Sequence, residues 1–499
     1  MKVHLLFQNK DYDPKNEISP QEQAVCEDLE LDTLVSAMSG DDEFLATTIR
    51  PLLYCSLLHE EEILYRQEIL RDSLTHASLV QELYSLAVAG WENKAAQDYM
   101  IFGHSPTMLL ERAVLELEGE LPILASLRDL AEKSLPVMKT PGWQTFFQML
   151  QQELTREYLQ GLQKLLQELH FPQGLLVRVH PGIKLTAEAH TVCQIPDTPS
   201  EGWFKKLRKR FRPTKRFSIV LAERDESGHQ ILSEMLNTAV AGTAATVAAC
   251  QEHVRAFFAS LRTELAFYLG CLRLAKRLNE KGIALSFPIL DPAVNFSCQE
   301  LSNITLALRM TTSPVTNTIN AETYPLVMIT GANQGGKTTF LRSLGQARIM
   351  MGCGMFVAAA YFRGEIGRIF THFRREEDQQ MKSGKFDEEL QRMNDLIDCL
   401  HAGDLLLLNE SSAATNEREG SAIALEILQA LYSCGIKVAF VTHFYALAHT
   451  LQQSEQPILF LRAGCRPDGK RTFAMETGKA MRTSFGMHIY HNVFGNATD

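Results

Sequence analysis

The sequence predicts a multi-domain protein in which a mostly α-helical region is followed by an α/β domain. The chain has 499 residues, a length that suggests about three structural units. Long Leu- and Ile-rich stretches with helical spacing dominate its first part, and after residue 300 short apolar runs alternate with helical patterns. Strands that alternate with helices indicate a largely parallel sheet. We therefore expect a helical region over residues 1–300 and an α/β domain over residues 301–499.

Composition and charge exclude several classes of protein. Hydrophobic residues make up 45% and charged residues 22%, which is ordinary for a globular chain and excludes disorder over most of it. The 10 cysteines form no C-x-x-C pair, so we expect neither a zinc ribbon nor a disulfide framework, but a cytoplasmic protein with reduced thiols. The most apolar low-charge run, 238–250, is shorter than the ~20 residues that span a bilayer, which predicts no membrane insertion.

The helices of the first region are predicted from apolar spacing. The stretch 27–74 is expected to form helices with a break at Pro51. Apolar residues at helical spacing over 150–169 predict a helix that ends before Pro172. A further apolar stripe over 254–272 predicts a helix that packs against its neighbours.

Strands are predicted at two places in the same region. The stretch 175–185 alternates between apolar and polar residues, and its Pro181-Gly182 pair indicates a turn, so it predicts a short strand pair. The run FSIVL at 217–221 is a further strand candidate.

A basic insertion is predicted near 195–217. Its segment 205–216 carries eight Lys and Arg residues and no acid, although the net charge of the whole chain is −10. Such a segment can neutralise several phosphates of DNA, which gives salt-sensitive and sequence-independent binding. A solvated loop and a contact with an acidic partner are the alternatives. The residues that we expect to contact DNA are Lys205, Lys206, Arg208, Lys209, Arg210 and Arg212.

The α/β domain is predicted from four apolar runs that are each followed by Gly or polar residues and then by a helical pattern. These runs are strand candidates, at 326–330, 354–357, 405–408 and 438–442.

The strongest motif is GANQGGKT at 331–338, which fits the P-loop pattern G-x-x-x-x-G-K-[ST] and lies between a predicted strand and a predicted helix. Glycines let backbone N–H groups point at phosphate oxygens, and the helix N-terminus adds the positive end of its dipole. We expect Lys337 to reach the β- and γ-phosphates and the Thr338 hydroxyl to ligate Mg²⁺. The predicted nucleotide site consists of Gly331, Ala332, Asn333, Gln334, Gly335, Gly336, Lys337, Thr338 and Thr339.

A second motif, LLLLNE at 405–410, has the Walker B pattern of a buried strand that ends in an acidic pair. The first acid of that pattern normally holds the Mg²⁺ shell, and the second orients the attacking water. Here Asn409 occupies the first position, where its amide can bind a metal-bound water but brings no negative charge. Glu410 occupies the second position and is the candidate general base.

A third candidate is His443, which follows the apolar run at 438–442. A polar residue at this point can lie beside the γ-phosphate and report its presence. The alternative is a histidine that only satisfies a backbone group at the end of a strand.

Taken together, these motifs resemble the ATPase domain of the MutS family of DNA mismatch-repair proteins. The P-loop of that family has the form TG-x-N-x-GGK-[ST]-T-x-[LM]-R, and the chain reads TGANQGGKTTFLR at 330–342. The segments SGKFDEEL (383–390), THF (442–444) and SFG (484–486) resemble three further family motifs. The resemblance covers about 320–490 and implies a P-loop ATPase domain of ABC type that uses ATP and Mg²⁺.

The resemblance also implies a dimer and DNA as a partner. In the family, the loop after Walker B completes the nucleotide site of the other subunit. The corresponding loop of this chain keeps the family's length and matches its pattern at Thr415, and Asn416 stands where the family has a small residue with a hydroxyl group. The segment 60–72 resembles the family's core-domain helix, and the helices beside the basic insertion resemble its lever helices. The F-x-E wedge that reads mismatches has its only counterpart at 386–388, inside the ATPase segment, so mismatch recognition is not expected.

Two functions fit this sequence. The first is an ATP-driven, dimeric clamp on duplex or branched DNA in repair or recombination control, with slow turnover because of Asn409. The second is a nucleotide-gated scaffold with little hydrolysis that acts through protein partners. A transporter-type ATPase is not favoured, because the sequence has no LSGGQ-like signature and no membrane segment.

Overall fold

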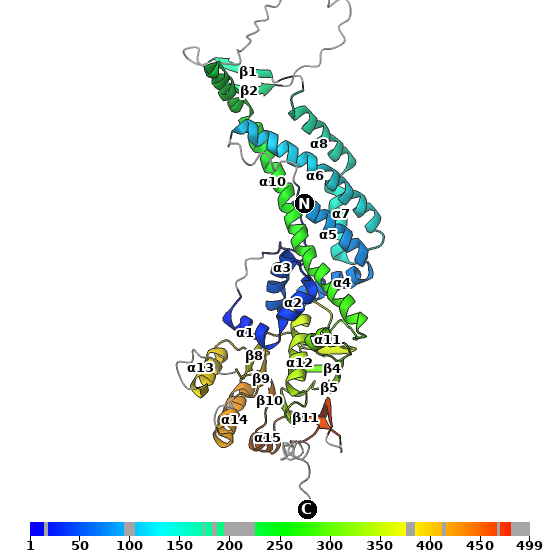
Figure 1. Ribbon diagram of the computed structural model, residues 1–499, viewed down its shortest axis with the longest axis vertical. Coiled ribbons are helices and arrows are strands. Elements are labelled where there is room, and N and C mark those ends of the chain that lie inside the picture. Colours follow the sequence, from blue (N-terminus) through cyan, green and yellow to red (C-terminus); the bar gives the residue numbers. More distant parts are fainter. Residues whose placement is uncertain are drawn as a thin grey trace, which may run out of the picture. The chain divides into compact units, whose positions relative to one another are not determined.

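The computed structural model of the chain describes residues 1–13, 18–93, 105–172, 174, 176–181, 187–193, 225–375, 385–411, 416–466 and 470–480. The chain groups into two compact units, the first of residues 1–3, 82–137 and 144–262 and the second of residues 4–81, 138–143 and 263–499 (Figure 1). Each unit combines segments that are distant in the sequence. The domain boundary that we expect near residue 300 therefore stays a prediction.

The first unit consists of helices and one strand pair. Polar N-caps start two of its helices: Ser105 Oγ accepts from Met108 N over 3.4 Å, and Thr155 Oγ1 accepts from Tyr158 N over 3.1 Å. Three of its helices, α5, α7 and α10, contribute residues to both units. Its elements are α5 (Ala77–Trp91), α6 (Pro106–Ser134), α7 (Pro141–Glu153), α8 (Arg156–Leu169), β1 (Leu176–Pro181), β2 (Ala187–Cys193) and α10 (Glu226–Glu280).

Two sequence-based expectations for this unit need correction. The apolar stripe over 150–169 belongs to two helices, because α7 ends at Glu153 and the Thr155 cap starts α8. The strand pair exists and is antiparallel, but its second strand begins at Ala187, beyond the predicted stretch. The strand candidate at 217–221 and the whole basic segment at 205–216 lie outside the described residues.

A buried carboxyl group lies between α6 and α10 in the first unit. The Glu120 side chain is only 2% exposed, and its Oε1 accepts a hydrogen bond from Gln251 Nε2 over 3.4 Å. Burial raises the pKa of Glu120 to about 8; the Gln251 bond and Arg255 lower it, whereas Glu116 and Glu252 raise it. Glu120 therefore stays protonated over much of the neutral range.

The second unit is built on a six-stranded sheet in the order β12-β11-β6-β10-β9-β8. Strands β11, β6, β10, β9 and β8 run parallel, and β12 pairs with β11 antiparallel. The strands are β6 (Leu326–Thr330), β8 (Ile369–Phe373), β9 (Leu405–Asn409), β10 (Lys437–Val441), β11 (Ile458–Cys465) and β12 (Arg471–Thr477).

A smaller sheet of mixed direction, in the order β3-β7-β4-β5, belongs to the same unit. Its strands are β3 (Ile289–Leu290), β4 (Phe296–Leu301), β5 (Asn317–Asn320) and β7 (Tyr361–Gly364), and the short helix α11 (Ile304–Arg309) follows β4.

Helices cover both faces of the six-stranded sheet. α12 (Lys337–Gly352) packs against β9 and β10, while α13 (Lys385–Ile397), α14 (Glu417–Ser433) and α15 (Tyr445–Gln452) share a core with the sheet's other face. The side chains of β9 alternate accordingly: Leu406 and Leu408 belong to that core, whereas Leu407 lies against Gly345 of α12.

Four helices from the start of the chain also pack in this unit, beside α12 (Figure 1). Arg342 of α12 donates to Asp28 O over 2.8 Å, and Gln346 donates to Leu29 O over 3.0 Å. The expected break at Pro51 is wrong, because this residue lies in the last turn of α3, and the helix ends at Tyr54. These helices are α1 (Pro20–Asp28), α2 (Leu31–Ser39), α3 (Glu43–Tyr54) and α4 (Glu60–Thr75).

The fold confirms the coarse prediction of a mostly helical chain with an α/β part. Three of the four strand candidates correspond to β6, β9 and β10. The fourth, 354–357, forms only an isolated bridge between Val357 and Ser286. Within the described ranges, no helix is both long and apolar enough to cross a membrane, and nine of the ten cysteines, all but Cys193, are described as free thiols.

Candidate functional site

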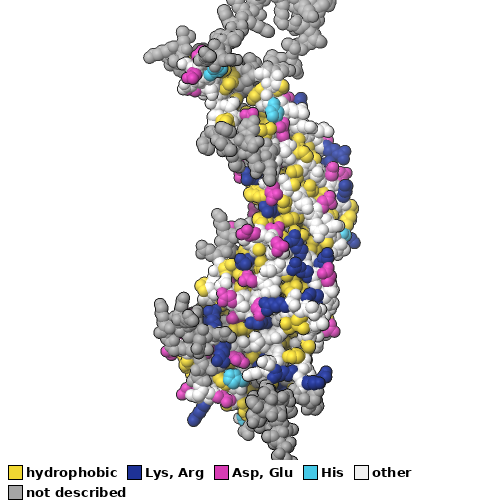
Figure 2. Space-filling model, in the orientation of Figure 1, with side chains coloured by type: hydrophobic (Ala, Val, Ile, Leu, Met, Phe, Trp, Pro, Cys, Tyr) yellow, Lys and Arg dark blue, Asp and Glu magenta, His cyan; other side chains and the backbone are white. Residues whose placement is uncertain are grey.

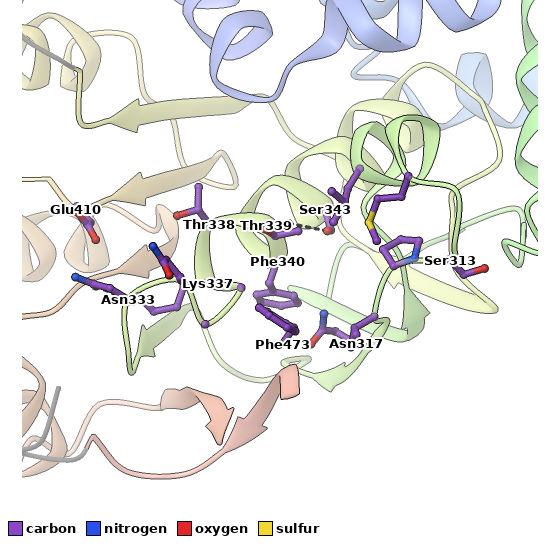
Figure 3. A pocket seen from close by; sticks show the side chains of 17 residues that line it. Ser313, Asn317, Asn333, Lys337, Thr338, Thr339, Phe340, Ser343, Glu410 and Phe473 are labelled. Atoms are coloured by element: carbon purple, nitrogen blue, oxygen red, sulfur yellow. Dashed lines mark hydrogen bonds between the residues drawn. The ribbon is translucent and has the colours of Figure 1, made fainter. Parts of the chain in front are cut away.

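A pocket of about 690 Å³ lies along the start of α12, at the carboxyl end of β6 (Figure 3). Figure 3 shows Asn333, Lys337, Thr338 and Glu410 toward one end of the pocket and Ser313 toward the other. Its wall also includes the apolar side chains of Leu306, Met310, Pro314, Val315 and Phe473. A concave, mostly apolar wall with a few convergent polar groups is the usual form of a small-molecule site.

The P-loop backbone fits tightly beneath the β11–β12 hairpin. Gly331 and Gly336 have φ values of 116° and 90°, which glycine adopts without strain. A Cβ at Gly331 would lie 2.9 Å from Ala463 N, and one at Gly336 would lie 3.1 Å from Phe473 O. Close approach of the hairpin therefore requires glycine at both positions.

Lys337 is buried at the N-terminus of α12 and is held by neutral acceptors. Its Nζ donates to Gly331 O over 2.9 Å and to Ala332 O over 3.0 Å, with Asn333 Oδ1 at 3.5 Å. Burial lowers the pKa of its ammonium group, nearby Glu410 raises it and Arg471 lowers it. The hydrogen-bond acceptors of Lys337 are therefore all neutral oxygens, and Glu410 is the nearby group that favours its positive charge.

The P-loop helix meets the Walker B strand at one hydrogen bond. Thr338 Oγ1 donates to Asn409 Oδ1 over 3.0 Å. Asn409 is the last residue of β9 and pairs in register with Val441 of β10. The residue that stands where the Walker B pattern has an acid therefore faces the hydroxyl expected to ligate Mg²⁺.

Glu410 lines the pocket from a turn with an unusual backbone. Its φ is 54°, and its N–H donates to Val441 O over 2.8 Å. Its Oε2 lies 3.8 Å from Arg374 Nη1. A non-glycine residue in the left-handed region is uncommon and marks a functional or strained position.

The turn after Glu410 is anchored to β8. Ser411 Oγ lies 2.7 Å from His372 Nδ1 and donates to His372 O over 2.9 Å. Burial, reinforced by Arg392, lowers the pKa of His372 to about 4, so the ring is neutral at physiological pH. The anchor fixes the direction in which the preceding Glu410 leaves the strand.

The other predicted site residues have different surroundings. His443 is exposed, two residues beyond β10, and is not among the residues that line the pocket. Asn416 forms the N-cap of α14, where its Oδ1 accepts from Glu419 N over 3.0 Å. Thr415 lies outside the described residues.

The predicted DNA contacts also lie outside the described residues, because residues 194–224 are among those that the structure does not describe. On the face shown in Figure 2, Lys and Arg side chains are interspersed with Asp and Glu side chains. The described part of that face presents no single-signed surface, and the DNA contacts stay a prediction because their residues are not described.

Sequence reasoning missed the part of the site that comes from the β11–β12 hairpin. Phe473 lines the pocket, with a φ of 60° and 49% exposure, and Arg471 Nη1 donates to Gln334 Oε1 over 3.0 Å. It also missed the apolar wall around Met310 and Val315. No local motif marks these residues; the only available signal was a second basic and aromatic run, RTF, at 471–473.

The residues present fit the phosphates of a nucleotide. The loop supplies a cation that is hydrogen-bonded to neutral oxygens, a hydroxyl and a helix N-terminus, which together favour a polyanion. Among the described residues, no cluster of three or more His, Cys, Asp or Glu side chains is arranged to hold a metal ion. The Thr338 hydroxyl would hold a Mg²⁺ ion together with the phosphates, which suits a cation that retains most of its waters.

Comparison with known proteins gives two matches to family models. Residues 59–281 match the MutS2 N-terminal domain, and residues 327–494 match MutS domain V. The second match contains the P-loop, the Walker B strand and His443.

Individual relatives are similar over shorter segments. The chain is 27% identical over 220 residues to MutS protein homolog 4 of Mus musculus, over 40% of this chain and 23% of that protein. It is 32% identical over 135 residues to Endonuclease MutS2 of Carboxydothermus hydrogenoformans, over 27% and 17% of the two chains. It is 30% identical over 181 residues to DNA mismatch repair protein MutS of Streptococcus pneumoniae, over 35% of this chain and 21% of that protein.

The matched segments span less than a quarter of the length of these relatives. The two family models nevertheless match in order along the chain, and the relatives from a mammal and from bacteria bear the same family name. The chain is a member of the MutS family.

Proposed function

We propose that the chain binds and hydrolyses ATP with Mg²⁺ and couples the nucleotide state to DNA binding as a dimeric clamp. One observation carries the proposal: the Thr338–Asn409 hydrogen bond joins the P-loop to the Walker B strand, and Lys337 and Glu410 line the same pocket. Three of these residues, Lys337, Thr338 and Glu410, line one pocket, which supports the proposal that phosphate binding, metal binding and water activation occur at one site.

In this proposal, the phosphates take the place of the carbonyl oxygens around Lys337. The Lys337 ammonium and the N-terminus of α12 neutralise the phosphate chain, and Asn333 donates to it from the loop. The apolar wall that includes Met310 and Val315 receives the nucleoside.

The reaction is assigned to groups at the end of β9. Thr338 and Asn409 orient the metal's water shell, and a bound Mg²⁺ neutralises the charge that develops on the phosphates. Glu410 orients the attacking water and accepts its proton, and its ion pair with Arg374 aligns the carboxylate. His443 is assigned to sensing of the γ-phosphate, which requires the exposed ring to move into the pocket.

DNA is proposed as the partner on the strength of the family. The names of the relatives refer to DNA mismatch repair and to an endonuclease. The basic segment at 205–216 is the proposed contact because it concentrates positive charge in an acidic chain. The segment that contains Thr415 and Asn416 is proposed to complete the nucleotide site of a second subunit.

A second candidate function is a nucleotide-gated scaffold with little hydrolysis that acts through protein partners. The observation in its favour is Asn409, because an amide supplies no negative charge to the metal where the Walker B pattern has a carboxylate. Such a site would bind ATP but turn it over slowly.

Steady-state ATPase assays with and without duplex and branched DNA separate the two functions. A clamp should hydrolyse ATP, and DNA should change the rate. The Lys337→Ala variant, purified in the same way and expected to lose ATP binding, measures contaminating activity. Tight ATP binding without turnover above that background would favour the scaffold, and no nucleotide binding at all would reject both functions.

A further inference from the structure

The β11–β12 hairpin lies directly on the P-loop. Ala463 of β11 lies within 2.9 Å of the Cβ position of Gly331 and within 2.7 Å of that of Gly335. Phe473 of β12 covers Gly336 and forms part of the pocket wall (Figure 3). The hairpin is therefore a wall of the nucleotide pocket as well as the edge of the sheet.

The same hairpin brings a second cation to the loop. Arg471 is the first residue of β12 and pairs in register with Cys465 of β11. Its Nη1 donates to Gln334 Oε1 over 3.0 Å, and Gln334 lines the pocket between Asn333 and Gly335. Arg471 is also close enough to Lys337 to lower the pKa of that ammonium group.

The partners of these two cations are neutral. Arg471 donates to an amide oxygen, and Lys337 donates to two backbone carbonyls. Another arginine of the same hairpin, Arg462, instead pairs with a carboxylate, Glu476, over 3.3 Å. The hydrogen bonds of Arg471 and Lys337 thus include no carboxylate, although the two positive charges lie close together. Such an arrangement favours the binding of a polyanion.

The backbone around Arg471 is held in place and strained. Gln334 and Phe473 both have φ values of 60°, in the left-handed region that non-glycine residues rarely adopt. Met475 N donates to Asn317 Oδ1 over 2.7 Å, which ties β12 to β5. The fold thus maintains the strained approach of the hairpin to the loop, as is common where a ligand is bound.

We propose that Arg471 is a second phosphate-binding residue of the nucleotide site, supplied in cis by the β11–β12 hairpin. Gln334 holds the guanidinium beside the loop until a phosphate chain competes for it. Arginine suits this task because its planar fork donates two hydrogen bonds to one phosphate. The inference rests on the proposed function, because it assigns a further contact to the same nucleotide.

Nucleotide titrations of matched variants test the proposal. Arg471→Ala should weaken ATP binding by ~10- to 100-fold, the range expected for loss of charged hydrogen bonds, and should weaken ADP binding less. Adenosine binding should not change, because adenosine carries no phosphate. Arg471→Lys, which keeps the charge but not the fork, should fall between the two.

The controls separate this contact from folding of the hairpin. Arg462→Ala removes an arginine from the same hairpin but outside the loop contact, and it should bind ATP like the wild type. Thermal melts of each variant check that the fold is intact.

Each result decides a different question. Wild-type affinity for ATP in the Arg471→Ala variant would overturn the inference and leave the proposed function standing. An equal loss for ATP and adenosine would also overturn it, because that pattern indicates distortion of the pocket. If the wild-type chain itself binds neither ATP nor ADP, the proposed function fails and the inference fails with it.

Discussion

Thr338 Oγ1 and Asn409 Oδ1 are 3.0 Å apart, in a hydrogen bond that the hydroxyl donates. One residue belongs to the first turn of α12 and the other to the last position of β9, 71 residues later in the chain. The contact fixes the register of β9 against the nucleotide pocket. It also places an amide at the point where a carboxylate would approach the metal.

Lys337→Ala should abolish tight ATP binding. The loop loses the ammonium group that now points at carbonyl oxygens, and we expect affinity to fall ~100-fold or more. Fluorescent-nucleotide titration measures the effect. Lys479→Ala, at an exposed lysine of the same unit, is the control; equal affinity in the two variants would reject the P-loop assignment.

Glu410→Gln should preserve ATP binding and reduce turnover by ~10²-fold or more, because an amide cannot accept the proton of the attacking water. Binding and steady-state hydrolysis should be measured on the same preparation. Glu426→Gln, at an exposed position of α14, controls for the loss of one negative charge. Unchanged turnover in Glu410→Gln would transfer the role to another group, with His443 as the next candidate.

Asn409→Asp should lower the Mg²⁺ concentration that supports half-maximal activity. The substitution puts a carboxylate beside the Thr338 hydroxyl, where it adds attraction for the metal's water shell. A Mg²⁺ titration of ATPase activity checks this, with Asn394→Asp on the exposed face of α13 as the charge control. An unchanged midpoint would mean that the end of β9 does not serve the metal.

DNA binding should weaken for all sequences alike when five basic residues are replaced with Ser: Lys205, Lys206, Arg208, Lys209 and Arg210. If the basic segment contacts about four to six phosphates, log K should fall with log salt at a slope of about −4 to −5, and the variant should flatten that slope. Salt titrations on duplex and branched DNA measure both quantities. A wild-type chain without DNA binding at low salt would exclude the clamp, and equal slopes would place the contact elsewhere.

Glu120→Gln should stabilise the protein at neutral and alkaline pH. The unfolded side chain ionises near its ordinary pKa of 4.5, whereas burial holds the folded pKa near 8, so wild-type stability falls as pH rises between these values. The amide removes this loss, and we expect a gain on the order of 2 kcal/mol at pH 8 and almost none at pH 4.

Thermal melts from pH 4 to 9 test this expectation. Glu157→Gln, at an exposed position in the first turn of α8, should leave the wild-type profile unchanged. Parallel pH profiles for Glu120→Gln and the wild type would show that the buried carboxyl does not govern the dependence.

The parts of the fold that the sequence predicts are those whose residues are contiguous in the chain. The P-loop lies between β6 and α12 because its strand, glycines and helix are contiguous, and β9 and β10 are continuous apolar runs, as buried parallel strands are. β8 was missed because its five residues, IFTHF, include two polar side chains that are nevertheless buried.

Long-range contacts set the limit of prediction for the rest. Pro51 predicts a break between helices, but the residue lies inside α3, which continues to Tyr54. Nothing near Arg471 or Phe473 indicates that a hairpin more than 130 residues downstream covers the P-loop. Their place in the site depends on which strand pairs with β6, and a linear pattern does not specify that pairing.

The packing of α1 to α3 against α12 limits how the protein can be divided. Leu29 lies within 2.8 Å of the Cβ position of Gly345, and Cys353 Sγ lies 3.2 Å from Leu52 O. A fragment cut near residue 300 would leave that side of the P-loop helix exposed to water and prone to aggregation. An autonomous nucleotide-binding fragment should therefore combine residues 4–81 and 138–143 with the region from residue 263 onward, joined by designed linkers.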